Sequence, residues 1–134
     1  MRDWNRALYG SFEKDSMLIL IADDVESVRT LVSKFVQRAG HDVVLAGDGI
    51  VACAALSSQP RIAVVITDYR MPGKGGLEVA CLSKTLKPDR PVVLMSAEIC
   101  QTTDDVDIFL RKPVEITLKR ISEILAQFDT DPAQ

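Results

Sequence analysis

Apolar residues along the chain follow two alternating patterns. Residues 17–22 are apolar without interruption, which is typical of a strand covered on both faces of a sheet. From Val25 onward the apolar residues recur three or four positions apart, as on one side of a helix, and Gly40 is suited to end that helix. The same alternation of short apolar runs and helical spacing continues to the end of the chain.

Five strands and four helices are predicted from these patterns. The strands are expected at residues 17–22, 42–46, 61–67, 91–95 and 106–110. Besides the helix from Val25, helices are expected at residues 48–58, 77–86 and 114–128. Strands that alternate with helices favour an α/β fold, with a parallel sheet covered by helices on both faces. Right-handed crossovers and five strands suit the flavodoxin-like, doubly wound strand order 2-1-3-4-5.

The length and charge of the chain restrict the class of protein. Its 134 residues correspond to one domain. With 16 basic and 19 acidic side chains and no block of like charge, the sequence disfavours a nucleic-acid partner. The longest apolar run is too short to span a bilayer, and the first 16 residues lack the apolar centre of a signal peptide. We therefore predict a cytoplasmic protein without a membrane partner.

The cysteines and the single histidine offer no metal site. Cys53, Cys81 and Cys100 are widely spaced, and His41 is the only histidine, so a zinc site is implausible. Three small, mostly buried thiols in a reducing cytosol are the expected state. His41 is predicted to be a solvated residue at a helix–strand turn, away from the candidate chemistry.

Polar side chains directly follow the apolar runs. Asp23 and Asp24 follow the first strand, Asp68 the third, Ser96 the fourth and Lys112 the fifth, so the topology should bring them together. Three carboxylates about 4 Å apart would repel by roughly 4 kcal/mol per pair at an effective dielectric of 20. Such a cluster needs a cation, and hard oxygen ligands favour Mg²⁺. The lysine supplies a point charge that can hold a phosphoryl oxygen.

Four short motifs at these strand ends resemble the signature of response-regulator receiver domains of two-component signalling. In chain order they are residues 23–24 (Asp-Asp), 68–73 (Asp-Tyr-Arg-Met-Pro-Gly), 95–97 (Met-Ser-Ala) and 112–113 (Lys-Pro). Each motif alone is common, but all four in the family's order are a specific combination. The resemblance extends over residues 17–128 and is to the single-domain, chemotaxis-regulator-like type.

The resemblance implies a phosphoacceptor and a metal site. Asp68 corresponds to the aspartate that takes the phosphoryl group. Asp24 and Asp68 would be direct Mg²⁺ ligands, together with the backbone carbonyl of Arg70. Asp23 would act through water.

The resemblance also implies roles for residues beyond the metal site. Ser96 would bond the phosphoryl group, Lys112 would pair with it, and Phe109 matches the aromatic switch position. The donor would be a phosphohistidine on a histidine kinase or a histidine phosphotransfer protein. The chain would promote its own phosphorylation and dephosphorylation without being a conventional enzyme. The Lys112–Pro113 peptide bond is expected to be cis.

One departure from the family pattern lies between the fourth and fifth strands. The family usually has room for a full fourth helix there, whereas residues 98–104 offer two turns at best. That helix is predicted to be short, distorted or absent. Because the fourth helix and fifth strand form the family's usual output face, recognition of the unknown downstream protein there is in doubt.

Structural alternatives exist for several of these residues. Asp23 and Glu26 form a capping-box pattern that could begin a helix. Asp68 could open a turn before the Pro-Gly pair. Ser96 could cap a helix, and Lys112 could be an ordinary solvated lysine.

The expected domain organisation is an extension at residues 1–16, a receiver domain at 17–128 and a tail at 129–134. Trp4, Leu8 and Phe12 recur every four residues, so the extension is either helical or disordered. With six residues after the last helix, no output domain is expected to follow, and a monomer or weak dimer would signal by protein contacts. A fragment of a hybrid kinase, an unphosphorylated pseudo-receiver and a metal-dependent phosphohydrolase are the alternatives. The last needs a second acid where Arg70 stands.

Overall fold

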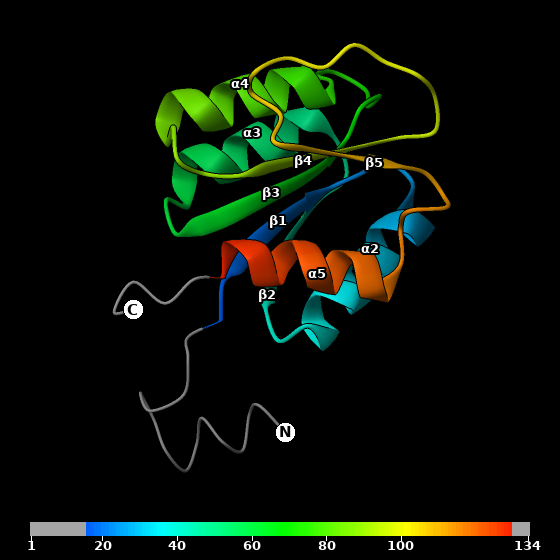
Figure 1. Ribbon diagram of the computed structural model, residues 1–134. Helices are drawn as coiled ribbons and strands as arrows, with labels where there is room; N and C mark the ends of the chain where they lie inside the picture. The colour runs from blue at the N-terminus through cyan, green and yellow to red at the C-terminus, as the bar shows by residue number, and fades with distance from the viewer. Residues whose placement is uncertain (1–15, 130–134) are drawn as a thin grey trace.

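A five-stranded parallel sheet lies at the centre of the computed structural model, which describes residues 16–129 (Figure 1). Its strands are β1 (Leu18–Ala22), β2 (Asp42–Ala46), β3 (Ile62–Asp68), β4 (Val92–Ser96) and β5 (Ile108–Arg111). They are ordered β2-β1-β3-β4-β5, which confirms the doubly wound, flavodoxin-like order. The predicted extension helix with Trp4, Leu8 and Phe12 lies outside the described residues.

Helices cover both faces of the sheet. They are α2 (Glu26–Arg38), α3 (Gly49–Ser58), α4 (Gly76–Leu86) and α5 (Leu118–Phe128). In Figure 1, α2 and α5 lie together on one face and α3 and α4 on the other, and both pairs are in contact. Within the part of the chain that the structure describes, none of these helices is long and apolar enough to cross a membrane.

The sequence of β1 is apolar throughout because helices cover both faces of this strand. Ile19 and Ile21 belong to the core cluster beneath α2 and α5, whereas Leu20 and Ala22 belong to the cluster beneath α3 and α4. All four side chains are fully buried. Burial of a large aliphatic side chain contributes about 1.5–3 kcal/mol, so both faces of this central strand stabilise the fold.

The closing helix begins later than the apolar pattern predicts. A start at residue 114 was expected, but Val114 is 70% exposed and α5 begins at Leu118. The hydroxyl of Thr117 accepts a hydrogen bond from the backbone N–H of Arg120 at 3.1 Å, which makes Thr117 the N-cap. Residues 112–115 form a turn instead. The predicted cis bond between Lys112 and Pro113 is confirmed.

The chain between β4 and β5 contains no helix in residues 97–107, which confirms the prediction of a short or absent fourth helix. This segment makes a wide excursion before it re-enters the sheet (Figure 1). Its return is fixed by Asp107, whose Oδ2 accepts hydrogen bonds from the backbone N–H of Val92 and from Lys84 Nζ, both at 2.8 Å.

The prediction of a solvated His41 is wrong. Its side chain is 5% exposed, and its Nδ1 accepts a hydrogen bond from the backbone N–H of Met17 at 3.1 Å. Its Nε2 lies 3.8 Å from Asp129 Oδ2, just beyond α5. These contacts join the start of β1 to the end of the last helix, which explains the burial. The expected position, away from the carboxyl ends of the strands, is correct because His41 directly precedes β2.

The expectation of mostly buried thiols holds for one cysteine. Cys53 lies on the buried side of α3, and burial raises the pKa of its thiol. Cys81 is exposed on α4, and Cys100 is partly exposed in the segment without a helix. All three are free cysteines.

Candidate functional site

The predicted site residues meet at the carboxyl edge of the sheet. Asp23 directly follows β1, Asp68 ends β3, and Lys112 directly follows β5. The Lys112 ammonium donates a hydrogen bond to Asp23 Oδ2 at 2.6 Å and another to Asp68 Oδ1 at 2.9 Å. One cation therefore joins residues that are 89 and 44 positions away from it in the sequence.

An acidic cluster adjoins this lysine. Asp23, Asp24 and Asp68 each offer a carboxylate oxygen, and these oxygens lie within 4.8 Å of one another. Asp23 is fully buried, Asp68 is 8% exposed, and Asp24 is exposed. Three carboxylates against one ammonium leave an excess of negative charge, and their donors are all hard oxygens. This donor set fits a divalent cation such as Mg²⁺, with solvent access from the side of Asp24.

Burial and charge shift the ionisation of the central pair. Burial raises the pKa of Asp68, and the nearby charge of Asp23 raises it further, against the lowering effect of the Lys112 ammonium. Burial acts to lower the pKa of Lys112, but its hydrogen bonds to both aspartates outweigh this, so its pKa is raised. The lysine is thus held as a cation.

The local fold around Asp23 differs from a capping box. Helix α2 has Val25 as its N-cap residue, without a capping side chain, so the capping-box alternative is wrong. Asp23 Oδ1 instead accepts the N–H of Val25 at 2.9 Å, while Oδ2 is taken by Lys112. Glu26, the other member of the pattern, is 87% exposed and lies 3.9 Å from Arg29. The carboxylate of Asp23 therefore bonds the lysine of the site and does not cap α2.

Ser96 ends β4 and turns its hydroxyl toward the backbone of Glu98. The hydroxyl donates to the Glu98 carbonyl at 3.0 Å and accepts from the Glu98 N–H at 3.1 Å. The side chain is 3% exposed, and its strand pairs with β3 next to Asp68. Because residues 97–107 contain no helix, the alternative in which Ser96 caps one is excluded.

Phe109 and Arg70 lie around this centre. Phe109 is partly buried in β5, opposite Leu94 of β4. The Arg70 side chain extends outward, 75% exposed, and pairs with the carboxylate of Glu98. Its guanidinium also lies 5.6 Å from the centre of the Tyr69 ring.

The contacts that two further residues make at the site were not predicted from the sequence. Arg29 Nη1 donates to the backbone carbonyl of Asp23 at 2.7 Å, and Glu98 bonds both Arg70 and Ser96. Neither Arg29 nor Glu98 belongs to one of the four motifs, and the Glu98 contacts depend on an irregular loop. Sequence periodicity carries no signal for such contacts.

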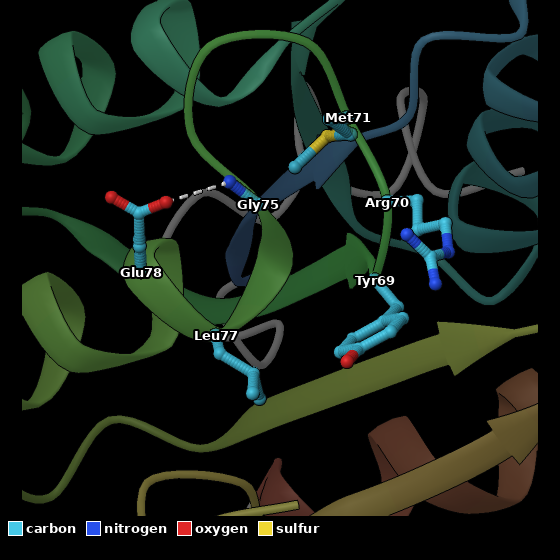
Figure 2. Close-up of a pocket in the computed structure, with 6 residues that line it drawn as sticks. All are labelled: Tyr69, Arg70, Met71, Gly75, Leu77 and Glu78. Carbon is cyan, nitrogen blue, oxygen red and sulfur yellow. Dashed lines mark hydrogen bonds between the residues drawn. The ribbon is translucent and has the colours of Figure 1, made fainter. Parts of the chain in front are cut away.

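A hollow of about 310 Å³ lies beside the site, where the chain leaves β3 and enters α4. Figure 2 shows the residues that line it: Tyr69, Arg70, Met71, Gly75, Leu77 and Glu78. Glu78 Oε1 accepts a hydrogen bond from the Gly75 N–H at 3.2 Å. The lining is therefore mixed: Tyr69, Met71 and Leu77 supply its apolar part, and the charged side chains of Arg70 and Glu78 supply polar groups.

Comparison with known proteins agrees with this architecture. A family model for the response regulator receiver domain matches residues 19–120. A chemotaxis protein CheY homolog of Campylobacter jejuni subsp. jejuni is 32% identical over 85 residues, which are 61% of this chain and 65% of that protein. Two-component response regulator ORR5 of Oryza sativa subsp. japonica is 32% identical over 107 residues, 72% of this chain and 78% of that protein.

Solved structures show the same fold. The response regulator protein TrrA of Thermotoga maritima, solved in complex with Mg²⁺ and BeF, is 27% identical. The similarity covers 84% of this chain and 98% of that one, with a TM-score of 0.74.

The share of a relative's length that the chain covers varies widely. It spans 16%, 54% and 65% of three of the curated relatives it matches, the first of them a DNA-binding transcriptional regulator from Bradyrhizobium. The family match nevertheless covers most of the chain, and the strand order is that of the fold shared with the solved receiver domains. The chain belongs to the response regulator receiver domain family of two-component signalling.

Proposed function

We propose that this chain is a phosphoacceptor, in which the Asp68 carboxylate takes a phosphoryl group from a phosphohistidine in the presence of Mg²⁺. The observation that carries the proposal is the contact of Lys112 with Asp68 and Asp23 inside a cluster of three carboxylates. A carboxylate nucleophile, a cation site and a lysine are sufficient for phosphoryl transfer, which depends mainly on alignment and charge neutralisation.

The metal-binding residues follow from the donor set. Asp24 and Asp68 would bind Mg²⁺ directly, together with the backbone carbonyl of Arg70, while Asp23 would act through water. The contacts of Asp23 support this division, because its two oxygens already accept from Val25 and Lys112. When bound, Mg²⁺ would neutralise charge on the transferred group.

The reaction transfers the phosphoryl group between two side chains. An Asp68 oxygen attacks phosphorus, the new O–P bond forms, and the N–P bond to the donor imidazole breaks, with its electron pair remaining on nitrogen. Lys112 would hold one phosphoryl oxygen by a charge-assisted hydrogen bond, and its hydrogen bond to Asp68 supports this role. The Ser96 hydroxyl would leave Glu98 for another oxygen, and the ring of Phe109 would follow it.

The proposed partners are proteins. The donor is a histidine kinase or a histidine phosphotransfer protein, and the output passes to a downstream protein by contact, in the cytoplasm. Exposed apolar side chains near the site suit protein contacts: Ile50 is 57% exposed and Ile99 90%. The chain would also promote its own dephosphorylation. The division into an extension at 1–16, a receiver at 17–128 and a tail at 129–134 stays a prediction.

A small-molecule phosphodonor tests the proposal without a known kinase. The purified chain is incubated with acetyl phosphate and Mg²⁺, and intact mass is measured with and without a chelator. One phosphoryl group should be added in Mg²⁺, and none in chelator, in Asp24→Ala or in Asp68→Asn. Asp89→Ala, an exposed acid in the turn after α4, should label as the unmodified chain does. Full labelling of Asp68→Asn, or none of the unmodified chain, would contradict the proposal.

A further inference from the structure

Ile99 is the most solvent-exposed large apolar residue of the described part of the chain. Its side chain is 90% exposed, compared with 70% for Val114 and less for the others. It lies at the start of the segment without a helix, directly after Glu98. No packing contact of the present conformation explains an isoleucine at this position, whereas a second conformation in which it is covered would explain it.

The hollow beside β3 offers a place for this side chain. Tyr69, Met71 and Leu77 form its apolar part, and all three are only partly buried (Figure 2). Arg70 lines the same hollow and pairs with Glu98, with Nη2 and Oε2 3.5 Å apart. The residue before Ile99 is therefore anchored to the rim of the hollow.

Two hydrogen bonds hold the present conformation. The Ser96 hydroxyl both donates to and accepts from the backbone of Glu98, which fixes a tight turn over residues 96–98. The Arg70–Glu98 pair involves only side chains, so it does not prevent the backbone of Glu98 from turning. Removal of the hydroxyl frees this turn while the carboxylate stays on the rim.

We propose that residues 97–100 form a strap whose Ile99 docks into the hollow between Tyr69, Met71 and Leu77 when the Ser96 hydroxyl leaves Glu98. The trigger rests on the proposed function, because a phosphoryl group on Asp68 would draw that hydroxyl away. The docked strap would lie beside the phosphoacceptor. It would cover the apolar side chains of the hollow only when Asp68 is phosphorylated, so the exposed apolar surface would differ between the two phosphorylation states. The two positions form a two-state equilibrium that the hydroxyl biases.

The occupant is the chain's own isoleucine, not that of a second copy. Ile99 is one peptide unit from a residue already held on the rim by Arg70. Such a tether gives the intramolecular partner a much higher effective concentration than a second molecule has.

The test observes the position of the Ile99 methyl group directly. Isoleucine δ1-methyl NMR is recorded for the unmodified chain, for the chain with Mg²⁺ and beryllofluoride, and for Ser96→Ala. We expect nuclear Overhauser contacts from Ile99 to Leu77 and the Tyr69 ring in the last two samples and none in the first. Ser58→Ala, which removes a hydroxyl bonded to the backbone within α3, is the matched control and should resemble the unmodified chain.

A second variant measures how much the docked side chain contributes. In Ser96→Ala, adding Ile99→Ala should speed amide exchange of residues 97–100 by about tenfold, because a buried isoleucine is replaced by a small side chain. Val114→Ala, at another exposed apolar residue, should leave these amides unchanged.

The outcomes distinguish failure of the strap proposal from failure of the proposed phosphoacceptor function. Contacts in Ser96→Ala with no ¹⁹F signal of bound beryllofluoride would support the strap and count against the proposed function. The strap is overturned if the contacts are missing in Ser96→Ala, or missing in a sample whose ¹⁹F spectrum shows bound beryllofluoride. It is also overturned if isotope-filtered spectra place the contacts between two molecules.

Discussion

Lys112 balances the charge of the acidic cluster at the scale of single residues. Its side chain is 14% exposed, and its ammonium contacts Asp23, whose side chain is fully buried. Removing one partner of a buried ion pair leaves an uncompensated charge, which costs more than the pair itself contributes. The lysine therefore stabilises the fold as well as the proposed chemistry.

Lys112→Met should lower the free energy of unfolding at neutral pH by on the order of 3 kcal/mol, because two carboxylates lose their shared cation. Urea unfolding measures this. Millimolar Mg²⁺ should restore part of the loss, since the metal supplies the missing positive charge. Lys119→Met, which removes an exposed lysine of α5, is the control. A Lys112→Met variant as stable as this control would contradict the balancing role.

The raised pKa of Asp68 predicts a pH dependence of stability without metal. The folded-state pKa of Asp68 lies above its ordinary value of 3.8. The contribution of its protonated carboxyl to the free energy of unfolding is therefore fully present below pH 3.8, and it is lost as pH rises through the folded-state pKa. Asp68→Asn lacks this titration. The variant should therefore gain stability relative to the unmodified chain as pH rises from about 3.8 through the folded-state pKa of Asp68. A difference in unfolding free energy that does not change from pH 3 to 7 would contradict the assignment.

The motif residues were predictable because each follows an apolar run at a strand end, and a parallel sheet brings those ends together. Their individual partners were not. Asp23 was given a role through water, and its bond to Lys112 depends on how far the lysine side chain extends past β5. His41 has no periodic neighbour pattern that indicates burial, since it is covered by Asp129 and Met17 from distant elements.

At the scale of elements, the start of α4 is packed against the end of β3. Gly76 begins the helix, and its N–H donates to the carbonyl of Tyr69 at 2.8 Å. A Cβ at Gly76 would lie 2.2 Å from the backbone carbonyl oxygen of Asp68. The residue thus allows the helix to approach the strand end that carries Asp68, the proposed phosphoacceptor.

Gly76→Ala should destabilise the fold by about 1–3 kcal/mol, because backbone must move to admit the methyl group. At an unhindered helical position the same change stabilises by roughly 0.5–1 kcal/mol, so the sign is informative. Gly47→Ala is the control, as its Cβ would meet only the flexible end of Arg29, at 3.4 Å. Thermal unfolding of both variants checks the difference, and equal melting temperatures would refute the close approach.

The predicted elements were correct where apolar spacing was strong and shifted where it was not. All five strands were found because each is apolar over several consecutive positions. The last helix was extended too far, since Val114 fits the helical spacing although the capping hydroxyl of Thr117 begins the helix three residues later. Capping and turn contacts decide such ends, and spacing alone does not reveal them.

At the scale of the whole molecule, the two edges of the sheet differ in character. The amino edge carries His41 and the contacts that join β1 to the end of α5. The carboxyl edge carries the acids, the lysine and the segment that replaces a helix between β4 and β5. The proposed chemistry and the proposed strap both lie at this second edge, so a signal need not cross the core.

The central claim is that the phosphoryl group resides on Asp68, and reductive trapping tests it most directly. The chain is treated with acetyl phosphate and Mg²⁺, and then with borohydride, which reduces an acyl phosphate to the corresponding alcohol. Peptide mass mapping should find homoserine at position 68 and unmodified aspartate at positions 23 and 24. Homoserine at either of those positions with Asp68 intact, or none anywhere in a sample whose intact mass shows phosphorylation, would contradict the account.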